Sequence, residues 1–366
     1  MISDRGESIL KDEINPFFEL KKDSIGVPSK YLGGKLRMVE LKNGQKCWAF
    51  GSKQYVEAAV HNVMDYLKKR CESLPKKCVT PISAGYRPEV DTSRELEPED
   101  AAYFHSLVGV LRWIVELGRI DINVEVSMLS SHLALPREGH FEEILHIFGY
   151  LQSHMNSEIV FDPSEPMIDM QNFQRQDWGY SVYSSPGEEP KEIVPSDMPE
   201  PLGKGFTIRC YVDADHAGES VTRRSRTGFV VILNNAPVHW FSKKQTSVET
   251  STFGSEMMAM KQAGEYLRGL RYKLRMFGIP VDGPAFIYGD NQSVLANTTR
   301  PESTIKKKSQ SIAYHFLREG CAADIWRTSY VHTSENVADL MTKPLSGEKR
   351  KKFVRMLLHH ICDDVA

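Results

Sequence analysis

Residues 206–213 read Phe-Thr-Ile-Arg-Cys-Tyr-Val-Asp, in which apolar and polar side chains alternate until the run ends on Asp213. This alternation is typical of a half-buried β-strand. A shorter apolar run at 285–289 is followed by Asp290, and a third strand-like run covers 325–331. Acids at strand ends can converge on one edge of a sheet, where sites form in α/β proteins. The pattern therefore predicts an α/β fold with acidic residues gathered at a sheet edge.

Glu256 heads the apolar stripe of a long predicted helix. Steps of three and four residues from Glu256 place one set of side chains on a single helix face: Met260, Ala263, Leu267, Leu270, Leu274 and Phe277. An ionised Glu at the start of a core-facing stripe incurs a large desolvation cost. We therefore expect Glu256 to be protonated, exposed at the helix end, or neutralised by a metal ion.

Asp339 completes a set of four carboxylates. It lies in the stretch Asn-Val-Ala-Asp-Leu-Met (336–341), on a short predicted helix after the third strand. A single Asp after a strand is usually a turn former or a helix cap, so each residue alone is a weak indication of a site. Four oxygen donors without His or Cys partners suit Mg²⁺ or Mn²⁺ rather than zinc. The four are Asp213, Glu256, Asp290 and Asp339.

Seven ordered motifs resemble the ribonuclease H domain of copia-type retrotransposon Pol polyproteins. They are Tyr-Val-Asp-Ala-Asp-His-Ala-Gly (211–218), Arg-Arg-Ser-Arg-Thr-Gly (223–228), Trp-Phe-Ser-Lys-Lys-Gln (240–245), Glu-Thr-Ser-Thr-Phe-Gly-Ser-Glu (249–256), Gly-Asp-Asn-Gln-Ser (289–293), Tyr-His-Phe-Leu-Arg-Glu (314–319) and Asn-Val-Ala-Asp-Leu-Met-Thr-Lys-Pro-Leu (336–345). The resemblance implies the ribonuclease H fold, a mixed five-stranded sheet flanked by helices. It also implies metal-dependent hydrolysis of the RNA strand of RNA–DNA hybrids.

In that family two metal ions, Mg²⁺ or Mn²⁺, clamp the scissile phosphate; one activates water and the other stabilises the leaving 3′ oxygen. Carried over by position, Asp213 would bind both ions and Asp339 would join it on the ion that activates water. Glu256 and Asp290 would complete the other ion site. Asp215 points to the same face of its strand as Asp213 and is a candidate substitute for it.

Two histidines lie near the predicted site. His332 follows the last predicted strand, where many ribonucleases H carry a His that helps water activation or product release, so it is a candidate auxiliary residue. The alternative for His332 is an ordinary loop histidine. His216, beside Asp213, is expected to pack or to hydrogen-bond rather than to carry protons.

The carboxyl-terminal half is cationic. Residues 203–366 hold 24 basic and 16 acidic residues, a net charge of +8, whereas residues 1–202 hold 22 basic and 32 acidic residues, a net charge of −10. A cationic domain favours binding of a nucleic-acid backbone. We expect backbone phosphates to contact Arg223, Arg224, Arg226, Lys243, Lys244, Lys306, Lys307 and Lys308. The last basic cluster, Lys349 to Lys352, is expected to be a solvated helix face.

The amino-terminal half predicts a hairpin, with strands at 31–39 and 47–50, followed by helices at 53–70, 101–117, 121–134 and 139–154. It resembles the end of a copia-type reverse transcriptase, with Tyr-Leu-Gly-Gly from 31 in the palm and Phe-His-Ser-Leu-Val-Gly-Val-Leu-Arg-Trp (104–113) in the thumb. No Tyr-x-Asp-Asp motif occurs, and the fingers and early palm would precede residue 1. Polymerase activity is therefore not expected from this chain. Its expected partners are an RNA–DNA hybrid and the remaining fingers and palm of a reverse transcriptase.

Composition and motifs together divide the chain into five expected parts. These are a partial palm and connector (1–98), a helical thumb-like subdomain (99–160), a Pro-rich connector (161–204), a ribonuclease H domain (205–350) and a carboxyl-terminal helix or tail (351–366). The alternative for the connector is a loop-rich segment packed against the sheet. Six cysteines without paired spacing, and no long apolar stretch, predict an intracellular protein, cytoplasmic or nuclear and not secreted.

Two other functions fit parts of this pattern. A non-catalytic retroelement remnant that binds nucleic acid would be expected to lack at least one of the metal carboxylates. An integrase would build a ribonuclease-H-like site from fewer acids and would lack the Asp-Asn-Gln-Ser stretch at 290–293. The sequence favours ribonuclease H over both.

Overall fold

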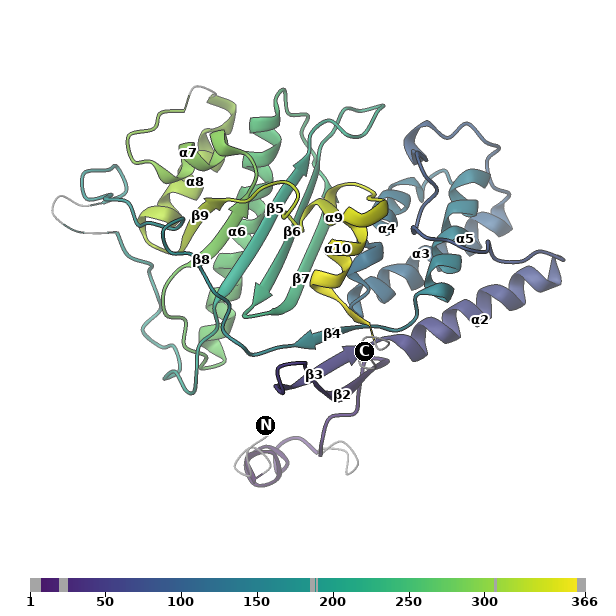
Figure 1. Ribbon diagram of the computed structural model, residues 1–366, viewed down its shortest axis with the longest axis horizontal. Coiled ribbons are helices and arrows are strands. Elements are labelled where there is room, and N and C mark those ends of the chain that lie inside the picture. Colours follow the sequence, from purple (N-terminus) through teal and green to yellow (C-terminus); the bar gives the residue numbers. More distant parts are fainter. Residues whose placement is uncertain (1–7, 20–25, 185–187, 189, 306–307, 361–366) are drawn as a thin grey trace.

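The computed structural model describes residues 8–19, 26–184, 188, 190–305 and 308–360. Two five-stranded sheets organise these residues, one built mainly from the amino-terminal half and one from the carboxyl-terminal half. Four helices, α2 to α5, form a separate group at one end of the molecule (Figure 1). No helix within the described ranges is both long and apolar enough to cross a membrane.

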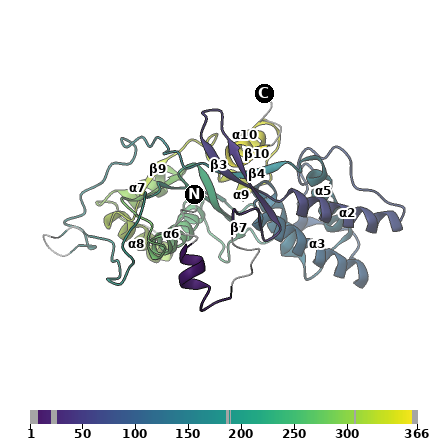
Figure 2. The same cartoon turned by 90° about the horizontal axis from the view of Figure 1, so that it is seen from below.

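The amino-terminal sheet has the strand order β1-β2-β3-β4-β10, and all its neighbours are antiparallel. Its β2–β3 hairpin confirms the hairpin predicted around the turn that contains Gly44, whose positive φ of 79° suits glycine. The last strand, β10, comes from the far end of the chain and pairs with β4 (Figure 2). The strands are β1 (Lys30–Tyr31), β2 (Gly34–Glu40), β3 (Lys46–Gly51), β4 (Ser157–Phe161) and β10 (His359–His360).

The four helices of the amino-terminal half pack around one apolar core. Their apolar stripes supply buried residues such as Val60, Leu111 and Phe148, as the helical periodicity predicted. The helix expected at 121–134 is shorter, because 3₁₀ turns at Ile120–Ile122 and Ser130–His132 replace its ends. The helices are α2 (Lys53–Lys69), α3 (Pro98–Glu116), α4 (Asn123–Leu129) and α5 (Glu138–Ser153).

The carboxyl-terminal sheet has the order β7-β6-β5-β8-β9. The β7–β6–β5 part is antiparallel, whereas β8 pairs parallel to β5 and β9 pairs parallel to β8. This mixed five-stranded sheet with flanking helices confirms the expected ribonuclease-H-like α/β fold. Its strands are β5 (Ile208–Asp215), β6 (Arg226–Leu233), β7 (Ala236–Lys244), β8 (Ala285–Gly289) and β9 (Trp326–Tyr330).

Helices cover both faces of this sheet. Cys210 and Val212 of β5 share one core with α6 and α8, while Val230 and Ile232 of β6 share a second core with α9, α10 and Ile159 of β4. Figure 1 shows α10 between this sheet and the α2–α5 group. The helices are α6 (Thr252–Met276), α7 (Gln292–Thr299), α8 (Ser311–Ala322), α9 (Asp339–Thr342) and α10 (Gly347–Leu357).

The expected domain boundaries differ from the packing at two places. The boundary at 350/351 falls inside α10, whose Phe353 is fully buried. The segment expected to be a connector is partly docked, because Phe173 and Trp178 are buried and Arg271 pairs with Glu192 at 2.6 Å. These parts of the connector therefore agree with the alternative prediction of a loop-rich, packed segment.

Candidate active site

Three of the four predicted carboxylates meet at the sheet edge. Asp213 lies near the end of β5, Asp290 directly follows the parallel neighbour β8, and Glu256 lies in the first turns of α6. Each offers one oxygen atom, and these oxygens all lie within 4.8 Å of one another. Such a spacing allows all three groups to bind one cation. The convergence follows from topology, since parallel neighbours end at the same edge.

Glycine lets a short helix close over this edge. Gly228 of β6 is the register partner of Asp213. A Cβ atom at Gly228 would lie 2.6 Å from Thr342 Cγ2 and 2.7 Å from Met341 Cβ. Because glycine has no side chain, α9 packs directly on β6 and brings the Thr342 hydroxyl to Asp213 Oδ2, to which it donates a hydrogen bond.

Burial makes the cluster unfavourable without a counter-ion. Asp213 is 3% exposed and Glu256 is 6% exposed. Desolvation, together with the nearby Asp339 and Asp290, raises the pKa of Asp213 to about 7, although Lys343 acts in the opposite direction. Desolvation and the charges of Asp213 and Asp290 raise the pKa of Glu256 well above its usual value. A divalent cation would compensate these charges, so the donor set fits the expected metal.

Asp339 is in a different environment. Its side chain is fully buried and lies in ion pairs with two lysines, Lys343 (Nζ–Oδ1 2.7 Å) and Lys349 (to Oδ2). Lys343 also lies 3.7 Å from Asp213 Oδ2, so its ammonium group links the two acids. The pKa of Lys343 is raised, because the attraction of Asp213 and Asp339 outweighs desolvation. The ammonium group of Lys343 therefore connects Asp339 to the cluster of three carboxylates.

The pairing of Lys343 and Lys349 with Asp339 was not predicted from the sequence. Lys349 was expected on a solvated face, and so was the adjacent Arg350, but both expectations are wrong. Lys349 pairs with Asp339, and Arg350 is 4% exposed and pairs with Glu125 of α4 at 3.1 Å. Helical periodicity was the available signal, since it puts Arg350 beside the buried Phe353 and Val354. Lys343 stands in a quoted motif but had no expected role.

The remaining acid and histidine candidates lie around the cluster. Asp215 is half-buried, and its pKa is raised by desolvation; it lines a neighbouring cavity rather than joining the three carboxylates. His216 Nδ1 lies 3.3 Å from the Ser255 hydroxyl, which agrees with the expected hydrogen-bonding role. His332 is exposed and its Nδ1 contacts the Ser334 hydroxyl at 2.8 Å. The loop that follows His332 reaches the site, because Thr333 donates to Asp290 Oδ2 at 2.9 Å.

The predicted phosphate-binding residues are not equivalent. Arg223, Lys243 and Lys308 are exposed, whereas Arg224, Arg226 and Lys244 are only partly exposed and line the neighbouring cavity. Arg226 donates to the hydroxyls of Ser127 and Ser242, and Lys244 lies 3.8 Å from Glu219. Lys306 and Lys307 lie outside the described residues.

Several known proteins that are similar to this chain come from transposons. The chain is 24% identical over 80% of its length to the retrovirus-related Pol polyprotein from transposon RE1 of Arabidopsis thaliana, of which it covers 17%. It is 23% identical over 93% of its length to the retrovirus-related Pol polyprotein from transposon TNT 1-94 of Nicotiana tabacum, of which it covers 22%. The chain thus spans about a fifth of these relatives. No family model matches the sequence.

Among solved structures, LC11-RNase H1 in complex with RNA/DNA hybrid matches 37% of this chain and 94% of its own, at 16% identity and a TM-score of 0.30. The fold assignment above stands on strand order and direction. Over most of its length the protein is similar to the Pol polyproteins of copia-type transposons, and this similarity supports their carboxyl-terminal part as its counterpart.

Proposed function

We propose that the carboxyl-terminal half is a metal-dependent ribonuclease H that hydrolyses the RNA strand of RNA–DNA hybrids. The observation that carries this proposal is the meeting of Asp213, Glu256 and Asp290 within 4.8 Å at the edge of a ribonuclease-H-like sheet. Two of these carboxylates are almost completely buried, and burial without a compensating cation is costly.

The residues of the chain divide the work as follows. Asp213, Glu256 and Asp290 would hold a divalent ion. When bound, such an ion stabilises the leaving 3′ oxygen and neutralises charge at the scissile phosphate. Thr342 fixes the orientation of Asp213 by its hydrogen bond, and Thr333 does the same for Asp290. Both hydroxyls donate to carboxylate oxygens, so they favour the ionised, metal-binding form.

The number of ions depends on the lysines at Asp339. The resemblance implies two ions, of which the second would use Asp213 and Asp339. Lys343 and Lys349 now supply positive charge at that position. We therefore propose that the cluster of three carboxylates binds the first ion tightly and that a second ion binds only when the lysines release Asp339.

Titration with Mn²⁺ tests the number of ions. Wild type should show one tight site, and Lys349→Met should strengthen the second site by about tenfold, because it removes one competing charge. Isothermal titration calorimetry gives both affinities. Lys351→Met is the control, since Lys351 pairs with the exposed Glu348 rather than with Asp339. Two equally tight sites in the wild-type protein would contradict this order of binding.

The amino-terminal half is proposed to be the end of a reverse-transcriptase palm (1–98) and a thumb-like subdomain (99–160). Its place beside the ribonuclease-H-like sheet supports a role in gripping the hybrid rather than in polymerisation. Ser127 of α4, for example, donates to the carbonyl of Ser242 in β7 at 2.9 Å. The fingers and early palm of a polymerase remain proposed partners.

A second candidate function is that of a non-catalytic remnant that binds nucleic acid. The ion pairs of Asp339 with two lysines favour this candidate, because they make the fourth carboxylate less available to metal. Incubation of the purified chain with a labelled RNA–DNA hybrid separates the two functions. Cleavage of the RNA strand in Mg²⁺ or Mn²⁺, abolished by a chelator, supports the enzyme. Binding without cleavage in either metal would support the remnant.

A further inference from the structure

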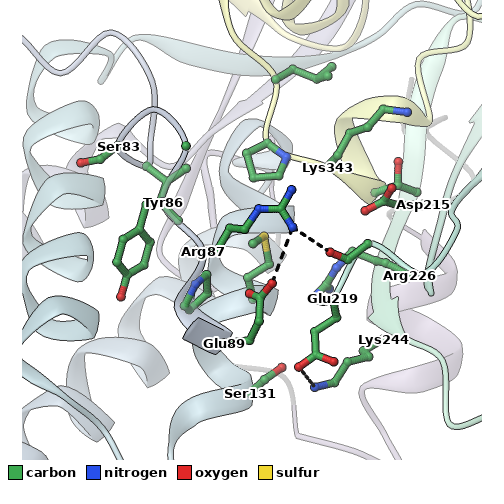
Figure 3. Close-up of a pocket in the computed structure, with 18 of the residues that line it drawn as sticks. Ser83, Tyr86, Arg87, Glu89, Ser131, Asp215, Glu219, Arg226, Lys244 and Lys343 are labelled. Atoms are coloured by element: carbon green, nitrogen blue, oxygen red, sulfur yellow. Dashed lines mark hydrogen bonds and ion pairs between the residues drawn. The ribbon is translucent and has the colours of Figure 1, made fainter. Parts of the chain in front are cut away.

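A cavity of about 490 Å³ lies where the amino-terminal half of the chain, which carries helices α2 to α5 and is called the helical half below, meets the turn between β5 and β6 (Figure 3). Segment 80–89, the region around Ser131, the β5–β6 turn and residues 342–346 all contribute to its lining. The cavity shares a wall with the candidate active site. Thr342 and Lys343 line the cavity and also contact Asp213. A nucleic-acid strand bound at the carboxylates would therefore pass beside this cavity.

The lining of the cavity carries an excess of positive charge. It includes five basic side chains, Arg87, Arg224, Arg226, Lys244 and Lys343, and three acidic ones, Glu89, Asp215 and Glu219. The difference is two positive charges. Several of these groups neutralise one another, because Lys244 lies 3.8 Å from Glu219 and Arg87 lies 4.0 Å from Glu89.

Beside these two pairs, Lys343 pairs with Asp339 at 2.7 Å, which leaves Arg224 and Arg226 with the single acid Asp215. Within the described part of the chain, the guanidinium group of Arg224 has no hydrogen bond or ion pair, and its Nε is buried without a partner. Among the described residues, Arg226 donates to two neutral hydroxyls, those of Ser127 (2.7 Å) and Ser242 (3.3 Å). Burial lowers the pKa of Arg226 to about 10, against the attraction of Asp215 and other acids. Both cations would gain from an anion in the cavity.

The helical half completes the cavity. Arg87 donates to the Ser220 hydroxyl at 2.6 Å, and Glu89 accepts a hydrogen bond from the backbone N–H of Ser220 at 3.0 Å. These contacts join segment 80–89 to the β5–β6 turn, and Figure 3 shows Arg87 and Glu89 facing Glu219, Arg226 and Lys244 across the cavity. The cavity therefore exists only because the two halves of the chain dock.

We propose that this cavity binds a phosphate group of the nucleic-acid strand that leads away from the carboxylate cluster, through Arg224 and Arg226. The inference rests on the proposed function and adds the helical half to the substrate-binding surface. Guanidinium groups suit this task, because their planar donors match phosphate oxygens. A free nucleotide offers the same chemistry, so the test includes one.

Binding of a fluorescently labelled RNA–DNA hybrid to the full chain, measured by anisotropy in EDTA, tests the proposal without cleavage. Arg224→Gln should weaken binding by about tenfold and reduce the slope of log affinity against log salt by about one. Arg224→Lys should retain part of the affinity. The matched control is Arg112→Gln, since Arg112 is an exposed arginine of α3 that does not line the cavity.

Arg226→Gln provides an independent variant, and its melting temperature shows whether the contacts with Ser127 and Ser242 are needed for folding. Equal effects of Arg224→Gln and Arg112→Gln, or no effect of either, would overturn the proposal. Displacement of the hybrid by millimolar nucleoside monophosphate in wild type but not in Arg224→Gln would support the cavity with a free nucleotide as its ligand. If the hybrid binds through Arg224 but is never cleaved, the result supports the phosphate site and contradicts the proposed ribonuclease activity.

Discussion

At the scale of single residues, the site is a balance between carboxylates and the cations available to them. Asp213, Glu256 and Asp290 face one another within 4.8 Å, whereas Asp339 is held by Lys343 and Lys349. Close carboxylates repel, and burial strengthens the repulsion because water no longer screens it. The repulsion between the carboxylates destabilises the metal-free protein. A bound cation relieves this repulsion, which therefore adds to the affinity for the cation.

Asp290→Asn should reduce hybrid cleavage by at least about a hundredfold, because it removes a metal ligand without changing volume. Its fold should persist, since an amide oxygen can still accept the hydrogen bond from Thr333. Cleavage rate and melting temperature are the two measurements. Asp282→Asn is the control, because Asp282 is an exposed acid in the loop before β8. Wild-type cleavage by Asp290→Asn would refute its assignment.

The raised pKa of Asp213 predicts a dependence of stability on pH. Its pKa is about 7 in the folded protein, whereas an Asp in the unfolded chain has a pKa of about 3.9. Between these values the unfolded state loses its proton first, so rising pH destabilises the metal-free fold across this window, and the loss is complete above pH 7. Glu256 adds to the effect in the same direction.

Melting temperatures of wild type and Asp213→Asn, compared at pH 5.5 and 7.5 in EDTA, isolate this contribution from that of the histidines. Wild type should lose several degrees more than the variant as the pH rises. Mg²⁺ should stabilise wild type more at pH 7.5, since metal competes with protons. Parallel pH profiles for the two proteins would show that Asp213 is ionised throughout.

At the scale of elements, the site depends on how closely α9 approaches β6. The absence of a side chain at Gly228 allows Thr342 to reach Asp213 and brings Lys343 beside it. Helix α6 contributes differently, because its first turns carry Glu256 while its later turns fill the core with Ala263 and Leu267. Packing elsewhere along these elements therefore fixes the positions of the acids.

Gly228→Ala should cost about 1–3 kcal/mol of unfolding free energy, because its Cβ would overlap the α9 backbone and the Thr342 side chain. It should also lower cleavage, since Thr342 would move away from Asp213. Urea unfolding and the hybrid assay measure the two effects. Gly269→Ala, on the exposed face of α6 with open space around it, should instead stabilise by up to about 1 kcal/mol. Similar behaviour of the two variants would argue against close α9 packing as the cause.

At the scale of the whole molecule, the two halves form one interlocked unit. Helix α10 belongs in sequence to the ribonuclease-H-like half, yet Arg350 pairs with Glu125 and donates to the carbonyl of Asp121. Strand β10 then continues the amino-terminal sheet. Asp121 itself accepts from Arg119 (2.7 Å) and from Tyr150 (2.9 Å), so a buried polar network spans the interface.

Arg350→Met should destabilise the full chain by about 3–5 kcal/mol, because it leaves Glu125 buried without its partner. Glu125 already has its pKa raised to about 7 by burial. The double variant Arg350→Met/Glu125→Gln should recover part of the loss. Urea unfolding gives the free energies, with the exposed Arg355→Met as control. A loss for Arg350→Met no larger than that of the control would show that the halves are not coupled through this residue.

The periodicity of the sequence determined the local structure. Alternation in 206–213 gave β5, and helical spacing gave the core face of α6 with Glu256 at its start. Such patterns are readable because a buried face requires apolar side chains at a fixed period. The ordered motifs then predicted the ribonuclease H fold and the three acids that the structure brings together.

Only the tertiary structure decided what lies around those acids. Asp339 stands in a recognisable motif, but its pairing with Lys349 depends on how α10 packs. The cavity with Arg224 and Arg226 likewise depends on the docking of the helical half. Local sequence patterns do not encode such contacts between distant segments. Local order follows from side-chain period, whereas charge compensation is settled between residues far apart in the chain.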